Sequence, residues 1–182
     1  MEATIERGTN FMDNIEVYKA KKGNKEAFAK LIIENEKTMY RVAKNYLSSN
    51  EDIIDVISEA TLKAYEKIKS LKDDSYFKTW LIRILINECY ILLRKNKREV
   101  LDFEEAVVDQ IHIDNYENLD LNTAMELLPA NMKIILSLHY YDDLSVKDIS
   151  LALDIKENTV KTNLKRGREK LYVLLKGGNH HE

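Results

Sequence analysis

The class of fold is decided by the stretch YFKTWLIRILINECYILLRK, which spans residues 76–95. Its apolar side chains recur three and four positions apart, so that Leu81, Leu85 and Cys89 share one face, as in a helix that packs on a core. The most apolar part, residues 81–93, is too short to cross a bilayer and is interrupted by polar and charged side chains. The stretch therefore predicts a long helix of a water-exposed protein.

The same helical spacing continues on both sides of this stretch. No segment alternates between apolar and polar residues over more than four positions, and one proline and five glycines leave few turn signals. We therefore expect an all-α fold without a sheet. Its helices are expected near residues 12–21, 28–47, 53–71, 76–95, 122–129, 131–141, 145–153 and 157–175.

The charges of the chain are unevenly distributed, although the whole chain has a net charge of −3. Residues 1–98 carry 19 basic and 15 acidic side chains, whereas residues 99–122 carry eight acidic side chains and no Lys or Arg. A block of like charge cannot pack against itself and is typical of a linker. We expect two small helical domains, 12–97 and 122–176, joined by an acidic linker over 98–121. The alternative is that the acidic stretch is only a solvated loop and not a linker between domains.

The last two expected helices enclose a tight turn at residues 154–156, and their apolar spacing is that of a helix-turn-helix. Asp154 stands where such turns often have glycine, and aspartate tolerates the left-handed conformation better than most residues. Residues 156–176 contain seven basic and two acidic side chains, which suits phosphates and guanine edges in a major groove. The face turned away from the apolar stripe carries Lys161, Thr162, Lys165, Arg166, Arg168 and Lys170, and Thr159 lies at the helix start. The alternative is an ordinary solvated surface.

Two further faces in the first domain are candidate binding surfaces. Trp80, Arg83 and Asn87 lie on one side of the helix over 76–95, after the polar loop 72–77. Aromatic rings beside a cation and hydrogen-bonding groups can hold unstacked bases of a single strand, or a flipped base. Phe77 and Trp80 taken alone are more often core residues. Asp55, Ser58 and Glu59 lie on the outer face of the helix over 53–71, near Lys63 and Lys67. This face is either a docking surface for a partner or an ordinary solvated surface.

Nothing in the sequence indicates catalysis. The four histidines lack the spacing of metal ligands or of a catalytic triad, no glycine-rich phosphate loop is present, and the single Cys89 excludes a disulfide framework. We expect no catalytic residue, no metal, no cofactor and no small-molecule substrate. The N-terminus has Glu2, Glu6 and Arg7 and no apolar signal core, so we expect a cytoplasmic protein.

Six short segments, taken in order, resemble extracytoplasmic function sigma factors, which are initiation subunits of bacterial RNA polymerase. They are NKEAF (24–28), EDIIDV (51–56), FKTWLIRI (77–84), LP (128–129), LSVKDI (144–149) and NTVK (158–161). The resemblance covers about residues 12–175 and implies two helical domains, called regions 2 and 4, with a linker that threads toward the basic RNA exit path.

The resemblance also implies roles for individual residues. Those expected to contact the minus-ten element are Lys72, Asp73, Ser75, Tyr76, Phe77, Trp80, Arg83 and Asn87. Those expected to contact the minus-thirty-five element are Thr159, Lys161, Thr162, Lys165, Arg166 and Arg168. Those expected to bind core RNA polymerase are Asp55, Ser58, Glu59, Thr61 and Lys63. The implied partners are the β′ and β subunits of core RNA polymerase, promoter DNA and an anti-sigma factor.

A second interpretation of the sequence is a helix-turn-helix regulator that binds a palindromic operator as a dimer. The segment 71–87 discriminates between the two, because a repressor would not need it.

Overall fold

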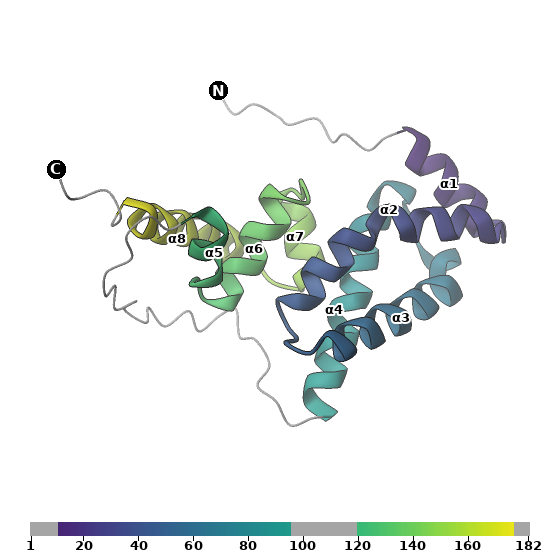
Figure 1. Cartoon of the computed structure of the whole chain (residues 1–182). Helices are drawn as coiled ribbons and strands as arrows, with labels where there is room; N and C mark the ends of the chain where they lie inside the picture. Colours follow the sequence, from purple (N-terminus) through teal and green to yellow (C-terminus); the bar gives the residue numbers. More distant parts are fainter. Residues whose placement is uncertain (1–10, 96–119, 177–182) are drawn as a thin grey trace.

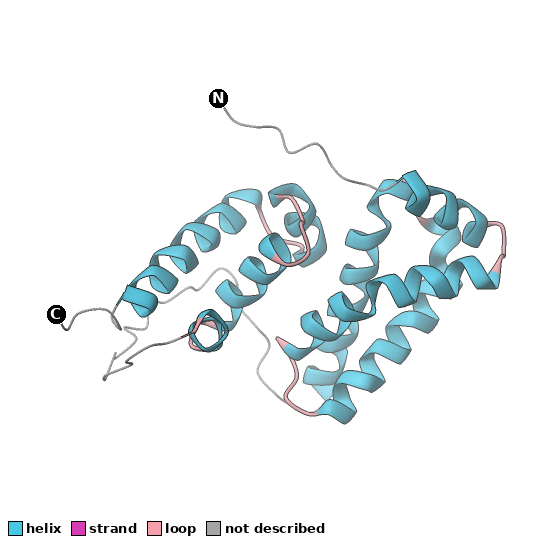
Figure 2. Ribbon diagram, turned by 45° about the horizontal axis from the view of Figure 1, so that its top comes forward, coloured by secondary structure: helices cyan, strands magenta, loops and turns pink. Residues whose placement is uncertain are grey.

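The structure is a computed structural model that describes residues 11–95 and 120–176. Within these two ranges it consists of eight α-helices and two short 3-10 turns, with no strand (Figure 2). This confirms the all-α fold class. The expected linker, 98–121, lies almost wholly outside the described residues; at its end Asp120 caps a helix through its carboxylate, which accepts a hydrogen bond from the backbone N–H of Thr123.

The first group of helices is a bundle of four. Its helices are α1 (Phe11–Lys21), α2 (Lys25–Lys44), α3 (Asn50–Lys67) and α4 (Phe77–Lys95), and the turns η1 (Ile68–Ser70) and η2 (Asp74–Tyr76) connect α3 to α4. Side chains at the helix starts fix the boundaries: Asn24 accepts a hydrogen bond from the N–H of Ala27, and Ser49 accepts one from Asp52. Gly23, with φ of 94°, supplies the left-handed residue between α1 and α2.

The core of this bundle is built around α4. Leu81, Leu85 and Cys89 are fully buried on the face that the sequence predicts, and α4 packs against both α2 and α3. Burial of each large aliphatic side chain contributes about 1.5–3 kcal/mol. Phe28 and Tyr65 add an edge-to-face aromatic contact between α2 and α3, with ring centroids 5.1 Å apart.

The second group of helices carries the helix-turn-helix. Its helices are α5 (Leu121–Glu126), α6 (Ala130–Tyr140), α7 (Val146–Leu153) and α8 (Glu157–Lys176). Gly167 lets α8 approach α6 closely, because a Cβ at that position would lie 2.7 Å from Cδ1 of Leu136. Asp154, in the turn between α7 and α8, has φ of 58° and ψ of 43°, so the expected left-handed conformation is confirmed.

The two groups lie side by side, with α7 packed against α4 (Figure 1). Their buried apolar side chains form one connected cluster. No helix within the described residues is both long enough and apolar enough to cross a membrane.

Candidate nucleic-acid interface

The C-terminal helix α8 has one buried face and one basic face. Val160, Leu164 and Leu174 are buried, whereas Lys161, Thr162, Lys165, Arg166 and Arg168 are exposed and Thr159 is half-buried. The basic side chains stay close to their own helix: Nε of Arg168 donates to the carbonyl of Leu164, and Lys165 pairs with Glu169 at 4.0 Å. An exposed pair of this kind contributes little to stability. The face is therefore a row of cations and hydroxyls in contact with solvent.

The turn before α8 fixes the angle between the two helices of the motif. Ser145 and Asp148 form a reciprocal capping box at the start of α7. At its other end, the N–H groups of Asp154 and Ile155 both donate to the carbonyl of Ser150, whose hydroxyl donates to the carbonyl of Ile155 at 2.6 Å. These bonds satisfy the end of α7 and set the direction in which α8 leaves the turn.

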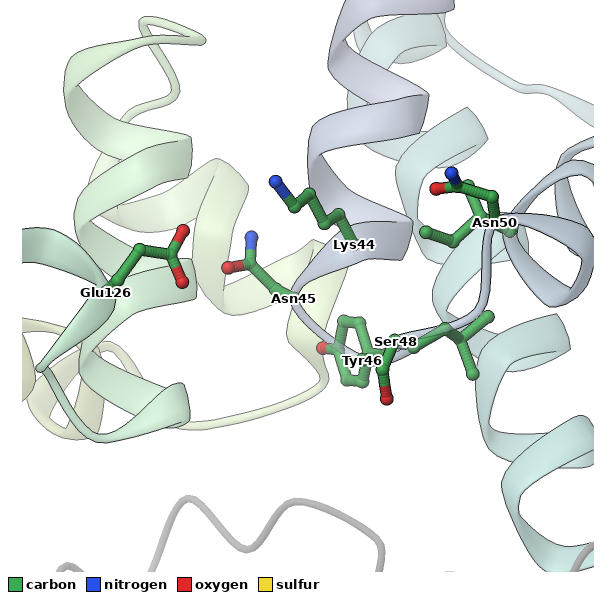
Figure 3. A pocket seen from close by; sticks show the side chains of 8 residues that line it. Lys44, Asn45, Tyr46, Ser48, Asn50 and Glu126 are labelled. Carbon is green, nitrogen blue, oxygen red and sulfur yellow. The ribbon is translucent and has the colours of Figure 1, made fainter. Parts of the chain in front are cut away.

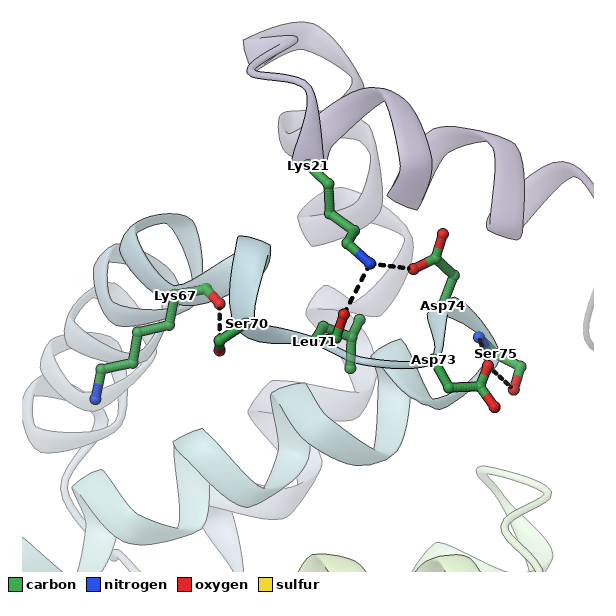
Figure 4. Close-up of polar contacts among 7 residues, drawn as sticks. All are labelled: Lys21, Lys67, Ser70, Leu71, Asp73, Asp74 and Ser75. Carbon is green, nitrogen blue, oxygen red and sulfur yellow. Dashed lines mark hydrogen bonds and ion pairs between the residues drawn. The ribbon is translucent and has the colours of Figure 1, made fainter.

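The loop between α3 and α4 is held in shape by polar contacts (Figure 4). Nζ of Lys21 donates to the carbonyl of Leu71 and to the carboxylate of Asp74, both at 2.7 Å. The carboxylate of Asp73 accepts from the N–H and the hydroxyl of Ser75, at 2.9 and 2.7 Å. Two of the predicted minus-ten residues, Asp73 and Ser75, thus shape the loop through their own hydrogen bonds. Lys21, which supports the loop from α1, was missed by the sequence reasoning because no local pattern links positions 50 residues apart.

The helix α4 presents four of the other predicted minus-ten residues, and Lys72 and Tyr76 precede it. Arg83 and Asn87 are exposed and Trp80 is half-buried, so these three share a face that reaches solvent. Phe77 is only 5% exposed, and its ring centroid lies 6.0 Å from that of Trp80. In this arrangement Phe77 is therefore a core residue whose ring packs against the ring of Trp80. Lys72 is exposed and Tyr76 half-buried.

The helix α3 presents the predicted polymerase-binding residues. Asp55, Ser58 and Glu59 are exposed, whereas Thr61 is half-buried with its hydroxyl donating to the carbonyl of Ile57. The ammonium of Lys63 forms an ion pair with the buried carboxylate of Glu88 on α4. The hydrogen bond that Lys63 donates to Glu88 raises the pKa of Lys63 above its usual value.

Apolar side chains missed by the sequence reasoning lie on the same helix. They are Ile54, Leu62 and Tyr65, which are 60%, 54% and 40% exposed. They are eight and three positions apart, which places them on one side of α3. This spacing is visible in the sequence, next to the carboxylates on the same helix. The α3 face therefore combines carboxylates with exposed apolar groups, as an interaction surface does.

An open hollow of about 340 Å³ lies between the end of α2 and the short helix α5 (Figure 3). Its lining includes Lys44, Asn45, Ser48, Asn50 and Glu126. Hydrogen bonding to Lys133, and then the charges of Lys133 and Lys44, hold the pKa of Glu126 below its usual value. None of the predicted site residues lines the hollow, and the described residues contain no group of three or more metal-ligating side chains.

Comparison with known proteins identifies both halves of the chain. The family described as Sigma-70 region 2 matches residues 31–99, and the family described as Sigma-70, region 4 matches residues 118–171. The chain is 28% identical to the RNA polymerase sigma factor SigV of Bacillus subtilis over 159 residues, covering 86% of this chain and 96% of that protein. It is also 28% identical over 174 residues to the ECF RNA polymerase sigma-E factor of Escherichia coli K12, covering 86% of this chain and 91% of that protein.

Two solved structures share the fold. CnrH in complex with the cytosolic domain of CnrY matches with a TM-score of 0.65 at 23% identity, over 90% of this chain and 96% of that chain. The sigma factor RpoE in complex with the anti-sigma factor NepR from Bartonella quintana matches with a TM-score of 0.62 at 27% identity, over 82% and 96%. The first half of the chain matches sigma region 2 and the second half matches sigma region 4. The chain therefore belongs to the sigma-70 family and is an alternative sigma factor of the extracytoplasmic function group.

Proposed function

We propose that this sigma factor binds core RNA polymerase, directs it to promoter DNA and helps to separate the strands there. The observation that supports this most is the pairing of two unlike surfaces on one chain: the basic face of α8 and the loop-and-helix surface around Trp80. The first suits a duplex groove and the second suits unstacked bases. Sigma factors are initiation factors without catalysis of their own, so binding energy does the work here.

The surface around Trp80 is proposed to hold the minus-ten element. Trp80, Arg83 and Asn87 would contact the opened strand, with Lys72 and Tyr76 at the edge of the loop. Extruding a base costs a few kcal/mol, and stacking of one base on an aromatic ring returns about 1–3 kcal/mol. Strand opening is therefore favourable only when several such contacts form together. The loop is suited to this, because Lys21 and Asp73 fix its backbone before DNA arrives.

The basic face of α8 is proposed to contact the minus-thirty-five element. Lys161, Thr162, Lys165 and Arg166 point away from the core and can reach base edges and phosphates of a major groove. Binding by this face alone is weak and dependent on salt. When polymerase fixes the distance between the two surfaces, the second contact becomes intramolecular and the pair becomes selective.

The outer face of α3 is proposed to bind the β′ subunit of core polymerase, and the second group of helices the β subunit. Asp55 and Glu59 supply charge, and Ile54, Leu62 and Tyr65 supply apolar area. Lys63 is proposed to act at the edge of this surface, since its ammonium is already engaged by Glu88. An anti-sigma factor is a further proposed partner, because the related RpoE of Bartonella quintana was solved in complex with NepR.

The test is transcription in vitro with core polymerase and the purified full-length chain, followed by sequencing of the 5′ ends of the transcripts. We expect specific start sites with the complex and weak promoter binding by the chain alone. Trp80→Ala and Asn87→Ala are expected to reduce open complexes about 5- to 100-fold while leaving duplex binding by the complex nearly unchanged. Lys25→Ala, an exposed cation at the start of α2, is the control.

The operator-binding regulator is not favoured, because residues 31–99 match sigma region 2. Two results together would support the regulator instead: the isolated chain binds a palindromic duplex tightly and with sequence specificity, and Trp80→Ala does not change that binding.

A further inference from the structure

The contact between the two helical groups is centred on one buried carboxylate. Asp142, in the loop between α6 and α7, has a side chain that is 2% exposed. Its Oδ1 accepts hydrogen bonds from the hydroxyl of Thr38, at 2.7 Å, and from the guanidinium of Arg41, both on α2. The backbone carbonyl of Asp142 accepts a third bond, at 2.8 Å, from Nζ of Lys78 on α4. Three side chains of region 2 thus converge on one residue of region 4.

The hydrogen bonding of Asp142 is incomplete. Oδ2 is buried and has no hydrogen-bond partner among the described residues. Removing a carboxylate from water costs several kcal/mol, and this is recovered only when both oxygens are well paired. Closing the contact therefore gains the ion pair with Arg41 but leaves one oxygen unpaired, whereas opening returns the whole carboxylate to water. The carboxylate consequently contributes only a small net free energy to the closed arrangement.

Two weaker contacts tie the two ends of α7 to region 2: Lys147 lies at its start, near Asp142, and Asp154 follows its last residue, about 12 Å further along the eight-residue helix. Nη2 of Arg83 lies 3.3 Å from Oδ1 of Asp154, and the ammonium of Lys147 lies 5.9 Å from the ring centre of Tyr76. Arg83 and Asp154 are 46% and 82% exposed, so their pair contributes little to stability. These contacts nevertheless place α7 over residues that belong to the proposed minus-ten surface.

The chemistry of these contacts is that of a protein bound to a polyanion. In the closed arrangement Arg41, Lys78 and Arg83 direct their cationic groups at oxygen atoms of region 4: two carboxylates and one carbonyl. Cations of this kind bind phosphate oxygens in nucleic-acid complexes. Asp142 and Asp154 therefore offer these cations the same kind of oxygen atoms that phosphates offer.

We propose that single-stranded DNA and region 4 compete for the same cations of region 2, so that strand binding and separation of the two regions are one coupled equilibrium. Asp142 is the residue that holds the closed state, and Arg41 and Lys78 become strand contacts when it leaves. This rests on the proposed function of the minus-ten surface and adds the regulation of that surface. If only a fraction of molecules is open, the apparent dissociation constant for the strand is the intrinsic value divided by that fraction.

The first measurement is the distance between two labels on the full-length chain. Cysteines introduced at the exposed positions Ser58 on α3 and Tyr172 on α8 carry the labels. Native Cys89 is fully buried, and burial raises the pKa of its thiol to about 12, so it resists labelling. We expect a single short distance in the parent chain and a longer, broader distribution in Asp142→Asn and Asp142→Ala. Addition of single-stranded DNA to the parent chain is expected to produce the same lengthening.

The second measurement is the affinity of these chains for a fluorescent single-stranded DNA of about 16 nucleotides. Asp143→Asn is the matched control, since it removes the same charge from the neighbouring exposed residue, whose φ of 54° asparagine also tolerates. We expect Asp142→Ala to bind about 3- to 10-fold more tightly than Asp143→Asn. Circular dichroism checks that each variant keeps its helices.

The outcomes separate this proposal from the proposed function. If the label distance or the strand affinity of the Asp142 variants equals that of Asp143→Asn, the coupling is wrong, even when the complex with core polymerase initiates normally. If the Asp142 variants open and bind the strand more tightly but no complex with polymerase initiates, the coupling holds and the sigma-factor assignment of the surface is wrong.

Discussion

At the scale of single residues, close packing at Gly167 outweighs helix propensity. In an exposed helix, replacing glycine by alanine stabilises by about 0.5–1 kcal/mol. Here the new Cβ would lie 2.7 Å from Cδ1 and 3.2 Å from Cγ of Leu136, which is 1% exposed and cannot move into solvent. The helices α6 and α8 would have to separate slightly.

We therefore expect Gly167→Ala to lower the free energy of unfolding by about 1–2 kcal/mol, as overpacking does. Urea unfolding of the full-length chain measures this. Leu136→Val shortens the opposing side chain, so adding Gly167→Ala to Leu136→Val should cost less than adding it to the parent. A cost that is equal in both backgrounds would show that the close approach to Leu136 is not the cause.

The ion pair between Lys63 and Glu88 yields a second prediction. Glu88 is 7% exposed and its carboxylate is paired with Lys63, so Lys63→Met leaves a buried charge without its cation. Because the lysine side chain is 34% exposed, water moderates the loss, and we expect about 1–2 kcal/mol of destabilisation. The double variant Lys63→Met with Glu88→Gln should recover most of it.

The same pair predicts a dependence on pH. The pKa of Lys63 is raised in the folded chain, so its stabilisation is fully present below the usual lysine pKa and is lost as pH rises through the raised value. The difference in unfolding free energy between the parent and Lys63→Met should be constant from about pH 7 to 9 and shrink toward about pH 11. A difference that stays constant to high pH would contradict this assignment.

At the scale of helices, the fold was largely predictable because each helix carries its own signals. Apolar spacing set the faces of α3 and α4, and Asn24 marked the start of α2. Side-chain roles were less predictable. The choice between base platform and core for Phe77 depends on what α4 packs against, which no local pattern contains, and the support of the loop by Lys21 joins two distant helices.

The end of α7 yields an element-scale prediction. Asp154 has φ of 58°, a conformation that costs less for glycine than for aspartate. We expect Asp154→Gly to stabilise the chain by up to about 1 kcal/mol, since the exposed pair with Arg83 that it removes is worth little. Asp154→Val, with a branched side chain at the same φ, should destabilise by about 1–2 kcal/mol. Thermal unfolding tests both; if glycine destabilises as much as valine, the carboxylate rather than the backbone conformation is what matters.

At the scale of the whole molecule, the contact between the two helical groups could not be predicted from the sequence. The hydrogen bonds to Asp142 join residues 64 to 104 positions apart, and an aspartate in a turn is ordinarily a capping residue. Its burial depends on the approach of α2 and α4, which is a tertiary property. Arg83 was predicted as a DNA contact from its face on α4, but its pairing with Asp154 follows only from the closed arrangement.

The closed arrangement predicts that the two halves associate even without a covalent connection. Each half has its own fully buried side chains, for example Leu81 and Leu85 in the first and Ile134 and Ile135 in the second, so we expect residues 11–95 and 120–176 to fold as separate helical fragments. A contact that combines one partly satisfied carboxylate, the bond from Lys78, two weak pairs and the apolar packing of α7 on α4 should give a dissociation constant of roughly 0.1–1 mM, or about −4 to −5.5 kcal/mol. A covalent connection supplies an effective concentration in the millimolar range, which is enough to keep most intact molecules closed and still leave an open fraction for DNA. Titration of isotope-labelled fragment 120–176 with fragment 11–95 should shift NMR signals of α7 and of the loop at Asp142, and Asp142→Ala should remove these shifts. The absence of shifts at millimolar concentration would mean that the two halves have no attraction of their own, and competition with DNA would then have nothing to displace.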